Sequence, residues 1–235
     1  MRLSPLGDRA IHIQLGSSID EATHRLVRAV CARLDERRPA GFVEYVPAFA
    51  SVVVHYDLTR VAGRAAGESP YERMAAALRE ALADLRDEAL PPARVVEIPV
   101  CYGGELGPDL EELARTHALT PDVVVRLHTA GDYLVYMLGF MPGFAYLGGL
   151  APELATPRRS TPRTNVPAGS VGIGGSQTGV YPLESPGGWH LLGRTPRPMF
   201  LPAEDPPTLL RMGDRVRFVA ISEAEYRAPA AGATS

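Results

Sequence analysis

Glycine and proline are distributed unevenly along this chain of 235 residues. Of 23 Gly and 22 Pro, residues 1–90 contain 9 and residues 91–235 contain 36. Both residue types interrupt helices and strands, so the first part can form long elements, whereas the second must use short ones joined by turns. We therefore expect a domain over 1–90, a second over 91–227 and a disordered tail over 228–235, with the boundary near Ala89–Ala93.

The first part alternates strand-like and helix-like patterns. Apolar and polar residues alternate over 10–15, which predicts a half-buried strand, and the runs 42–46 and 51–56 predict a hairpin. Strand, helix, hairpin and helix in this order indicate a small two-layer α/β sandwich.

The two helices of the first part are predicted from their starts and their apolar spacing. Ser18 with Glu21 and Ser69 with Glu72 have the spacing of capping boxes, and Pro70 suits a first helical position. The expected buried stripes are Leu26, Val30 and Leu34 in the first helix, and Met74, Leu78, Leu82 and Leu85 in the second.

The second part is predicted to be rich in short strands. Residues 94–100 alternate as a strand, in which Pro99 suggests an edge position. Short helices are expected to begin near Asp109 and at Thr120, followed from Tyr133 by β-rich runs that Gly and Pro interrupt. This pattern is typical of a β-barrel or sandwich, so the whole chain is of the α+β class.

All 24 basic residues are Arg, and the chain contains no Lys. This excludes a P-loop lysine, a Schiff base, a biotin attachment site and a Ser-Ser-Lys amidase triad. The net charge of −3 argues against a nucleic-acid surface built on bulk charge.

Cellular location is indicated by cysteine usage and by apolar runs. Cys31 and Cys101 are far apart and form no CxxC motif, which is a reduced, cytoplasmic pattern. The start of the chain lacks the pattern of a signal peptide. The uncharged run 134–151 contains Pro142 and four glycines, so we expect a strand and a loop there rather than a membrane span.

The segment 172–179, GIGGSQTG, is similar to a phosphate loop but matches neither nucleotide fingerprint, because Val180 stands where a P-loop needs Lys. Its backbone N–H groups are candidates for an anion-binding nest. The alternative is that the glycines only turn a corner of a barrel. The candidate anion-binding residues here are Gly174, Gly175, Ser176, Gln177 and Thr178.

Arginines and aromatic residues flank this segment. Arg158, Arg163 and Arg194 are candidates to bind a carboxylate or phosphate through the guanidinium fork, the alternative being solvated surface arginines. Tyr181 and Trp189 are candidates to contact a ligand or a partner, and core packing is equally compatible with their sequence context.

Signatures of catalysis are sparse. No GxSxG elbow, HExxH motif or acidic loop occurs, so we expect no bound metal. Among six dispersed histidines, His128 and His190 flank the Gly-rich region and are the candidates for acid–base catalysis. Residue chemistry alone therefore leads to a barrel with a polar cleft rich in Arg and Gly.

Three runs carry a resemblance to a known family. VYMLGFMPGFAYLGGL, ATPRRSTPRTNVPAGSVGIGGSQTGVYPLESPGGWHLLGRT and IPVCYGGELGPDLEELA closely resemble the KipI/PxpB family, also labelled allophanate hydrolase subunit 1. The resemblance covers nearly the whole chain. It implies a small N-terminal α/β domain followed by a cyclophilin-like β-barrel, without implying prolyl isomerase activity.

The resemblance also implies a function. PxpB-type members are subunits of an ATP-dependent 5-oxoprolinase, which opens 5-oxo-L-proline to L-glutamate together with PxpA-like and PxpC-like partners. The implied cofactor is ATP, the PxpC-like partner is expected to form a stable heteromer, and the active site is expected to lie partly on that partner. Two alternatives remain open, namely inhibition of a sensor histidine kinase and an accessory role in urea or allophanate metabolism.

Overall fold

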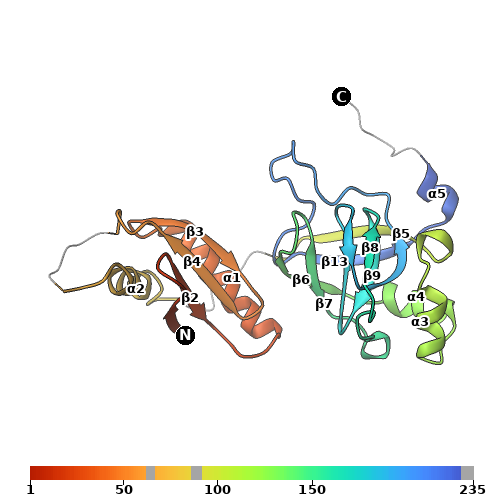
Figure 1. The fold of residues 1–235 in the computed structure, drawn as a ribbon, viewed down its shortest axis with the longest axis horizontal. Helices are drawn as coiled ribbons and strands as arrows, with labels where there is room; N and C mark the ends of the chain where they lie inside the picture. The colour runs from red at the N-terminus through yellow and green to blue at the C-terminus, as the bar shows by residue number, and fades with distance from the viewer. Residues whose placement is uncertain (62–66, 86–91, 229–235) are drawn as a thin grey trace. The chain divides into compact units, whose positions relative to one another are not determined.

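The chain divides into two compact units, Met1–Pro92 and Ala93–Ser235, in a computed structural model (Figure 1). The described residues are 1–61, 67–85 and 92–228. Residues 89–91 of the expected boundary and 229–235 of the expected tail lie outside them. Within the described residues, no helix is both long and apolar enough to cross a membrane.

The first unit contains a four-stranded antiparallel sheet in the order β1-β2-β4-β3. Its strands are β1 (Arg2–Pro5), β2 (Ala10–Gln14), β3 (Phe42–Pro47) and β4 (Ser51–Tyr56). The expected hairpin is confirmed as β3 and β4, and β1 is an additional strand. Alternate residues of β2 and β4 are buried, so one face of the sheet forms the core.

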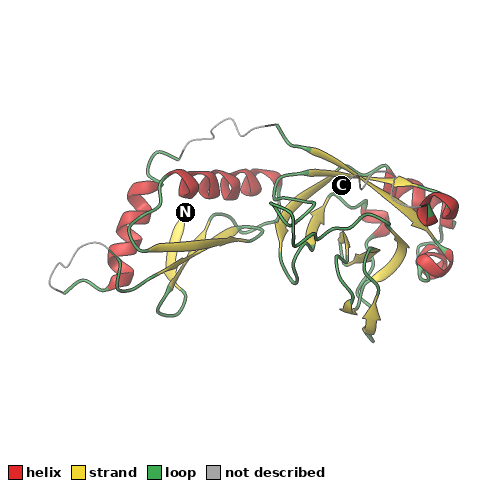
Figure 2. Ribbon diagram, turned by 90° about the horizontal axis from the view of Figure 1, so that it is seen from above, coloured by secondary structure: helices red, strands yellow, loops and turns green. Residues whose placement is uncertain are grey.

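Two helices accompany this sheet, and Figure 2 shows α1 (Glu21–Glu36) running along one of its faces. The expected Ser18–Glu21 capping box is wrong, because the carboxylate of Asp20 accepts from the backbone N–H of Thr23 at 2.7 Å. The capping box of Ser69 is confirmed at the start of α2 (Pro70–Ala81).

The buried stripe of α1 differs by one position from the predicted one. Val27, Val30 and Leu34 have no exposed surface, whereas Leu26 is 41% exposed. Positions 27, 30 and 34 repeat at the helical spacing of three and four, so the face is set by Val27. In α2, Met74 and Leu78 are buried as predicted.

The second unit is a closed barrel of seven strands in the order β10-β7-β6-β13-β5-β12-β9. The strands are β5 (Val95–Tyr102), β6 (Tyr133–Leu138), β7 (Ala145–Gly148), β9 (Ser170–Gly174), β10 (Gln177–Val180), β12 (His190–Arg194) and β13 (Arg215–Ala220). The fold class is therefore α+β, as predicted. Strand β5 as a whole is not an edge strand, since it lies between β12 and β13, but Pro99 itself has a paired neighbour on the β13 side alone. The register of β12 on β5 covers Cys101 and Tyr102 and does not reach Pro99.

Short elements surround the barrel. Figure 1 shows α3 (Leu110–Thr116) and α4 (Pro121–Thr129) beside one another, where they pack against β12 and β13 respectively. Strands β8 (Arg163–Val166) and β11 (Ser185–Gly187) pair with each other as a separate ribbon. The remaining short helices are η1 (Gly104–Leu106), η2 (Pro152–Leu154) and α5 (Glu223–Arg227).

Candidate functional site

His128, a candidate acid–base catalyst, lies in the last turns of α4 with no exposed surface. Its ring stacks on Phe218 of β13, with 4.5 Å between the centroids. Nδ1 lies 2.7 Å from the hydroxyl of Tyr102, and Nε2 lies 2.8 Å from Oγ1 of Thr178. Both ring nitrogens are therefore paired with side chains inside the barrel.

The directions of these hydrogen bonds define the tautomer of His128. The Thr178 hydroxyl donates to the carbonyl of Gly172 at 3.0 Å, so it accepts from Nε2–H of the histidine. Nδ1 then accepts from Tyr102. Burial lowers the pKa of His128 from 6.5 to about 3 and raises the pKa of Tyr102 well above 10. The ring is thus a neutral part of the core at physiological pH.

The Gly-rich segment is a β-hairpin. Gly175 and Ser176 form the turn between β9 and β10, and Gln177 pairs with Gly174 across it. Gly175 has a φ of +66°, a left-handed conformation that favours glycine, and its N–H donates to the carbonyl of Thr156 at 2.7 Å. This geometry favours the alternative in which the glycines turn a corner of the barrel. Anion binding by these residues stays a prediction.

The glycines also make room for an aromatic cluster beside the barrel core. A Cβ added to Gly174 would lie 2.5 Å from Cδ1 of Trp189, so only glycine fits against this ring. Trp189 and Tyr181 are 5% and 2% exposed, and both pack edge-on against Phe144, with centroids 5.5 Å and 5.6 Å away. Both side chains are therefore part of a packed aromatic cluster, and both also line a cavity beside it.

A cavity of about 230 Å³ lies against this cluster. It is lined by the aromatic residues Phe140, Phe144, Tyr146, Tyr181 and Trp189, by Arg158, and by Pro162, Pro186, Gly187 and Gly188. Arg158 is exposed and makes no hydrogen bond or ion pair with the residues that the structure describes. An apolar hollow with one unpaired cation suits a ligand that has an apolar body and a negative charge.

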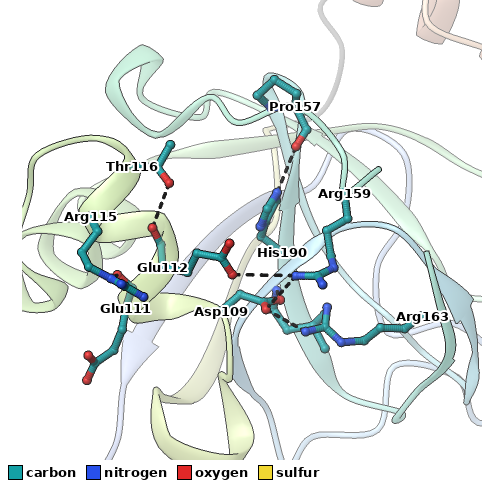
Figure 3. Close-up of polar contacts among 10 residues, drawn as sticks. Asp109, Glu111, Glu112, Arg115, Thr116, Pro157, Arg159, Arg163 and His190 are labelled. Carbon is teal, nitrogen blue, oxygen red and sulfur yellow. Dashed lines mark hydrogen bonds and ion pairs between the residues drawn. The ribbon is translucent and has the colours of Figure 1, made fainter. Parts of the chain in front are cut away.

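A buried carboxylate fixes the chain segment next to this cavity (Figure 3). Asp109 is 3% exposed, and its Oδ1 lies 2.7 Å from Nη2 of Arg163 and 3.2 Å from Nη1 of Arg159. Its Oδ2 accepts from the backbone N–H of Leu191 at 2.7 Å, and its own N–H donates to the Leu191 carbonyl. Arg163 is therefore paired with a carboxylate of the same chain, and binding of a ligand's anion by this arginine stays a prediction.

His190 and Arg194 lie at the two ends of β12. Nε2 of His190 donates to the carbonyl of Pro157 at 3.0 Å (Figure 3), while its buried Nδ1 has no partner among the described residues. Nε of Arg194 is also buried and has no hydrogen-bond partner among the described residues. Neither side chain lines the aromatic cavity. Acid–base catalysis by His190 and anion binding by Arg194 stay predictions.

Several residues of the site were not predicted from the sequence. Asp109 was expected only as the start of a helix, yet its side chain makes no cap bond because Arg159, Arg163 and Leu191 occupy it. Phe140, Phe144 and Tyr146 were not singled out, although three aromatic residues in a short Gly-rich segment are a usable signal. Across the described ranges, no group of three or more His, Cys, Asp or Glu side chains is placed to bind a metal ion.

Comparisons with known proteins agree with this architecture. Residues 1–210 match the family "Carboxyltransferase domain, subdomain C and D". The chain is 49% identical to the B subunit of 5-oxoprolinase from Bacillus subtilis over 97% of this chain and 95% of that protein. It is 56% identical to the B subunit of 5-oxoprolinase from Escherichia coli O157:H7 over 56% of this chain and 61% of that protein.

Solved structures show the same fold. The crystal structure of TTHA0988 matches with a TM-score of 0.78 and 39% identity over 91% of this chain, which spans 40% of the TTHA0988 chain. The Kluyveromyces lactis urea amidolyase is 19% identical with a TM-score of 0.75 over 95% of this chain and 15% of that chain, a likeness of fold alone. The resemblance to the KipI/PxpB family is thereby confirmed, and the chain belongs to the family of the carboxyltransferase domain, subdomain C and D.

Proposed function

We propose that this chain is the B subunit of an ATP-dependent 5-oxoprolinase, which opens 5-oxo-L-proline to L-glutamate together with PxpA-like and PxpC-like partners. The observation that carries the proposal is the 49% identity to the Bacillus subtilis protein over 97% of this chain. Likeness over both units favours the same role for the whole chain, not only a shared fold.

The reaction gives ATP a chemical task. The amide oxygen of the unstrained lactam attacks the γ-phosphorus of ATP, ADP leaves, and the ring carbon becomes a better electrophile. Water adds to this carbon, and the C–N bond breaks as the nitrogen takes up a proton, which leaves an acyl phosphate. A second water molecule hydrolyses the acyl phosphate to glutamate and phosphate. The groups that the reaction needs are therefore a phosphate-binding site, a lactam-binding site and a proton donor to nitrogen.

This chain supplies only part of that set. It has no Lys to hold the phosphates of ATP, and His128 is enclosed in the barrel core. A lactam site is the part that its aromatic cavity with Arg158 suits. We therefore expect the ATP site and the remaining catalytic groups on the PxpA-like and PxpC-like subunits, and a stable complex with the latter.

The test is reconstitution. The chain is co-expressed with its PxpA-like and PxpC-like partners, and glutamate release from 5-oxo-L-proline is measured with and without ATP. We expect ATP-dependent release by the complete set and none by this chain alone. Robust activity of the isolated chain would contradict the division of labour, and an inactive complete set would overturn the proposed function.

A further inference from the structure

The aromatic cavity has the size and walls of a site for a small molecule. Its volume of about 230 Å³ lies below the range of roughly 300–1,000 Å³ that holds drug-sized ligands, so it suits a compact ring. Phe144, Tyr146 and Trp189 form apolar walls, and a T-shaped contact fixes Phe144 on each of the other two, with centroids 5.1 Å and 5.5 Å away. These walls are therefore preformed.

One cation stands at this cavity. Arg158 lines it, is exposed, and makes no hydrogen bond or ion pair with the described residues. The next residue, Arg159, is committed to Asp109 at 3.2 Å, and its backbone N–H donates to the carbonyl of Gly188 at 2.8 Å. The chain on the C-terminal side of Arg158 is thus held in place, while the guanidinium of Arg158 stays available to a carboxylate.

A hydrogen-bond donor also lies in the cavity wall. A Cβ added to Gly187, a lining residue, would lie 2.5 Å from the hydroxyl oxygen of Tyr181, so this hydroxyl reaches the wall. A phenol hydroxyl can donate one hydrogen bond, so the hydroxyl of Tyr181 is a candidate donor to an acceptor in the cavity. Burial raises the pKa of Tyr181, so the group keeps its proton near neutral pH.

The rim of the cavity carries backbone strain. Phe140 has a φ of +71°, in the left-handed region that bulky residues rarely adopt, and its side chain is 65% exposed. The ring packs edge-on against Phe144 with 5.5 Å between centroids. An exposed aromatic side chain held in a strained conformation beside a cavity is typical of a functional site.

We infer that this cavity is the site that holds the lactam substrate, with the ring against Phe144 and Trp189, the carboxylate on Arg158 and the amide oxygen at the hydroxyl of Tyr181. The inference rests on the proposed function for the identity of the ligand, which is a small cyclic amide that carries one carboxylate. Arg158 and Tyr181 are binding residues in this arrangement, because they hold the substrate. A partner subunit would hold ATP and present its γ-phosphate to the amide oxygen at the mouth of this cavity.

Kinetics of the assembled complex test the assignment. Arg158→Ala should raise the KM for 5-oxo-L-proline by about 10- to 100-fold, as expected for a lost hydrogen bond to a charged group, with the KM for ATP unchanged. Tyr181→Phe should lower kcat/KM by about 2- to 10-fold. Arg217→Ala is the matched control, because Arg217 is exposed on β13 and lies outside the cavity. An unchanged KM in Arg158→Ala would overturn the assignment while leaving the proposed function intact.

Binding to the full chain provides a second measurement. The chain has one tryptophan, and Trp189 lines the cavity, so its fluorescence reports occupancy without background from other tryptophans. 5-Oxo-L-proline should change this signal in the wild type, and both Arg158→Ala and the use of 2-pyrrolidinone, which lacks the carboxylate, should weaken binding at least tenfold. Equal titration curves for wild type and Arg158→Ala would overturn the site. A response lost in Arg158→Ala while the complex is inactive would retain the site and reject the proposed reaction.

Discussion

Two polar groupings of the second unit contrast sharply. Around His128, both ring nitrogens are paired, with Tyr102 and Thr178, and the histidine has no exposed surface. At the aromatic cavity, Arg158 has no partner among the described residues, and the hydroxyl of Tyr181 lies against the lining residue Gly187. A buried polar group stabilises a fold only when it is satisfied, whereas an unsatisfied group at a cavity is free for a ligand. Substitutions should therefore affect stability at the first place and substrate binding at the second.

The largest loss of stability is expected for His128→Ala. The change leaves a cavity against Phe218 and removes the partners of Tyr102 and Thr178. We expect the free energy of unfolding to fall by about 4 kcal/mol. Urea denaturation followed by Trp189 fluorescence measures it, since the one tryptophan lies in the barrel unit. His190→Ala is the control. If His128→Ala lowers the free energy of unfolding no more than His190→Ala does, the stabilising role of His128 is contradicted.

Asp109→Ala should come next. Two guanidinium groups that are about a quarter exposed, those of Arg159 and Arg163, would lose their common carboxylate. We expect a loss of about 3 kcal/mol in the same denaturation experiment, as for breaking a mostly buried ion pair. Glu112→Ala is the matched control, because Glu112 is 61% exposed and lies 3.9 Å from Arg159. It should cost less than about 0.5 kcal/mol.

Acid should weaken the barrel through His128. Its pKa of about 3 in the folded state lies below the 6.5 of the unfolded state, so the unfolded chain binds the extra proton and stability falls as the pH drops below 6.5. Between pH 7 and pH 5 the contribution of this histidine amounts to about 2 kcal/mol. His128→Gln removes the titrating group, so the stability difference between wild type and variant should shrink by that amount on acidification. A constant difference would contradict the neutral, buried ring.

The smallest effect should come from Arg163→Lys. Lysine keeps a positive charge next to Asp109 but lacks the planar guanidinium. We therefore expect the free energy of unfolding to fall by about 1 kcal/mol. The kcat/KM of the assembled complex should stay at the wild-type value, because the partner of Arg163 is internal. Arg158→Lys should show the reverse, a wild-type melting temperature with a raised KM. Altered kinetics in Arg163→Lys at unchanged stability would place this arginine with the ligand instead.

The sequence predicted those features that local patterns determine. Two short apolar runs identified the hairpin of β3 and β4, and the spacing of Ser69 and Glu72 identified the start of α2. Local patterns erred where two candidates competed within one turn, as when Asp20 rather than Ser18 capped α1. The partner of Arg163 was beyond prediction, because Asp109 lies 54 residues away and the two meet only in the folded barrel. The Gly-rich segment was ambiguous for a similar reason, since the ring of Trp189 is what fills the space at Gly174.

The parallel pairing of β5 with β13 has a consequence for how the second unit folds. Arg215 lies beside Val95, and Arg94 bonds Asp214 at the same end, so the first and last strands of the barrel are adjacent across 120 residues. Contacts of such sequence separation form slowly, because a long loop must close before they stabilise the structure. During synthesis, the barrel therefore stays open until β13 has left the ribosome, with β5 and β6 as unpaired edges. The first unit, whose sheet consists of two local hairpins joined by the β2–β4 pair, can complete its fold well before that moment.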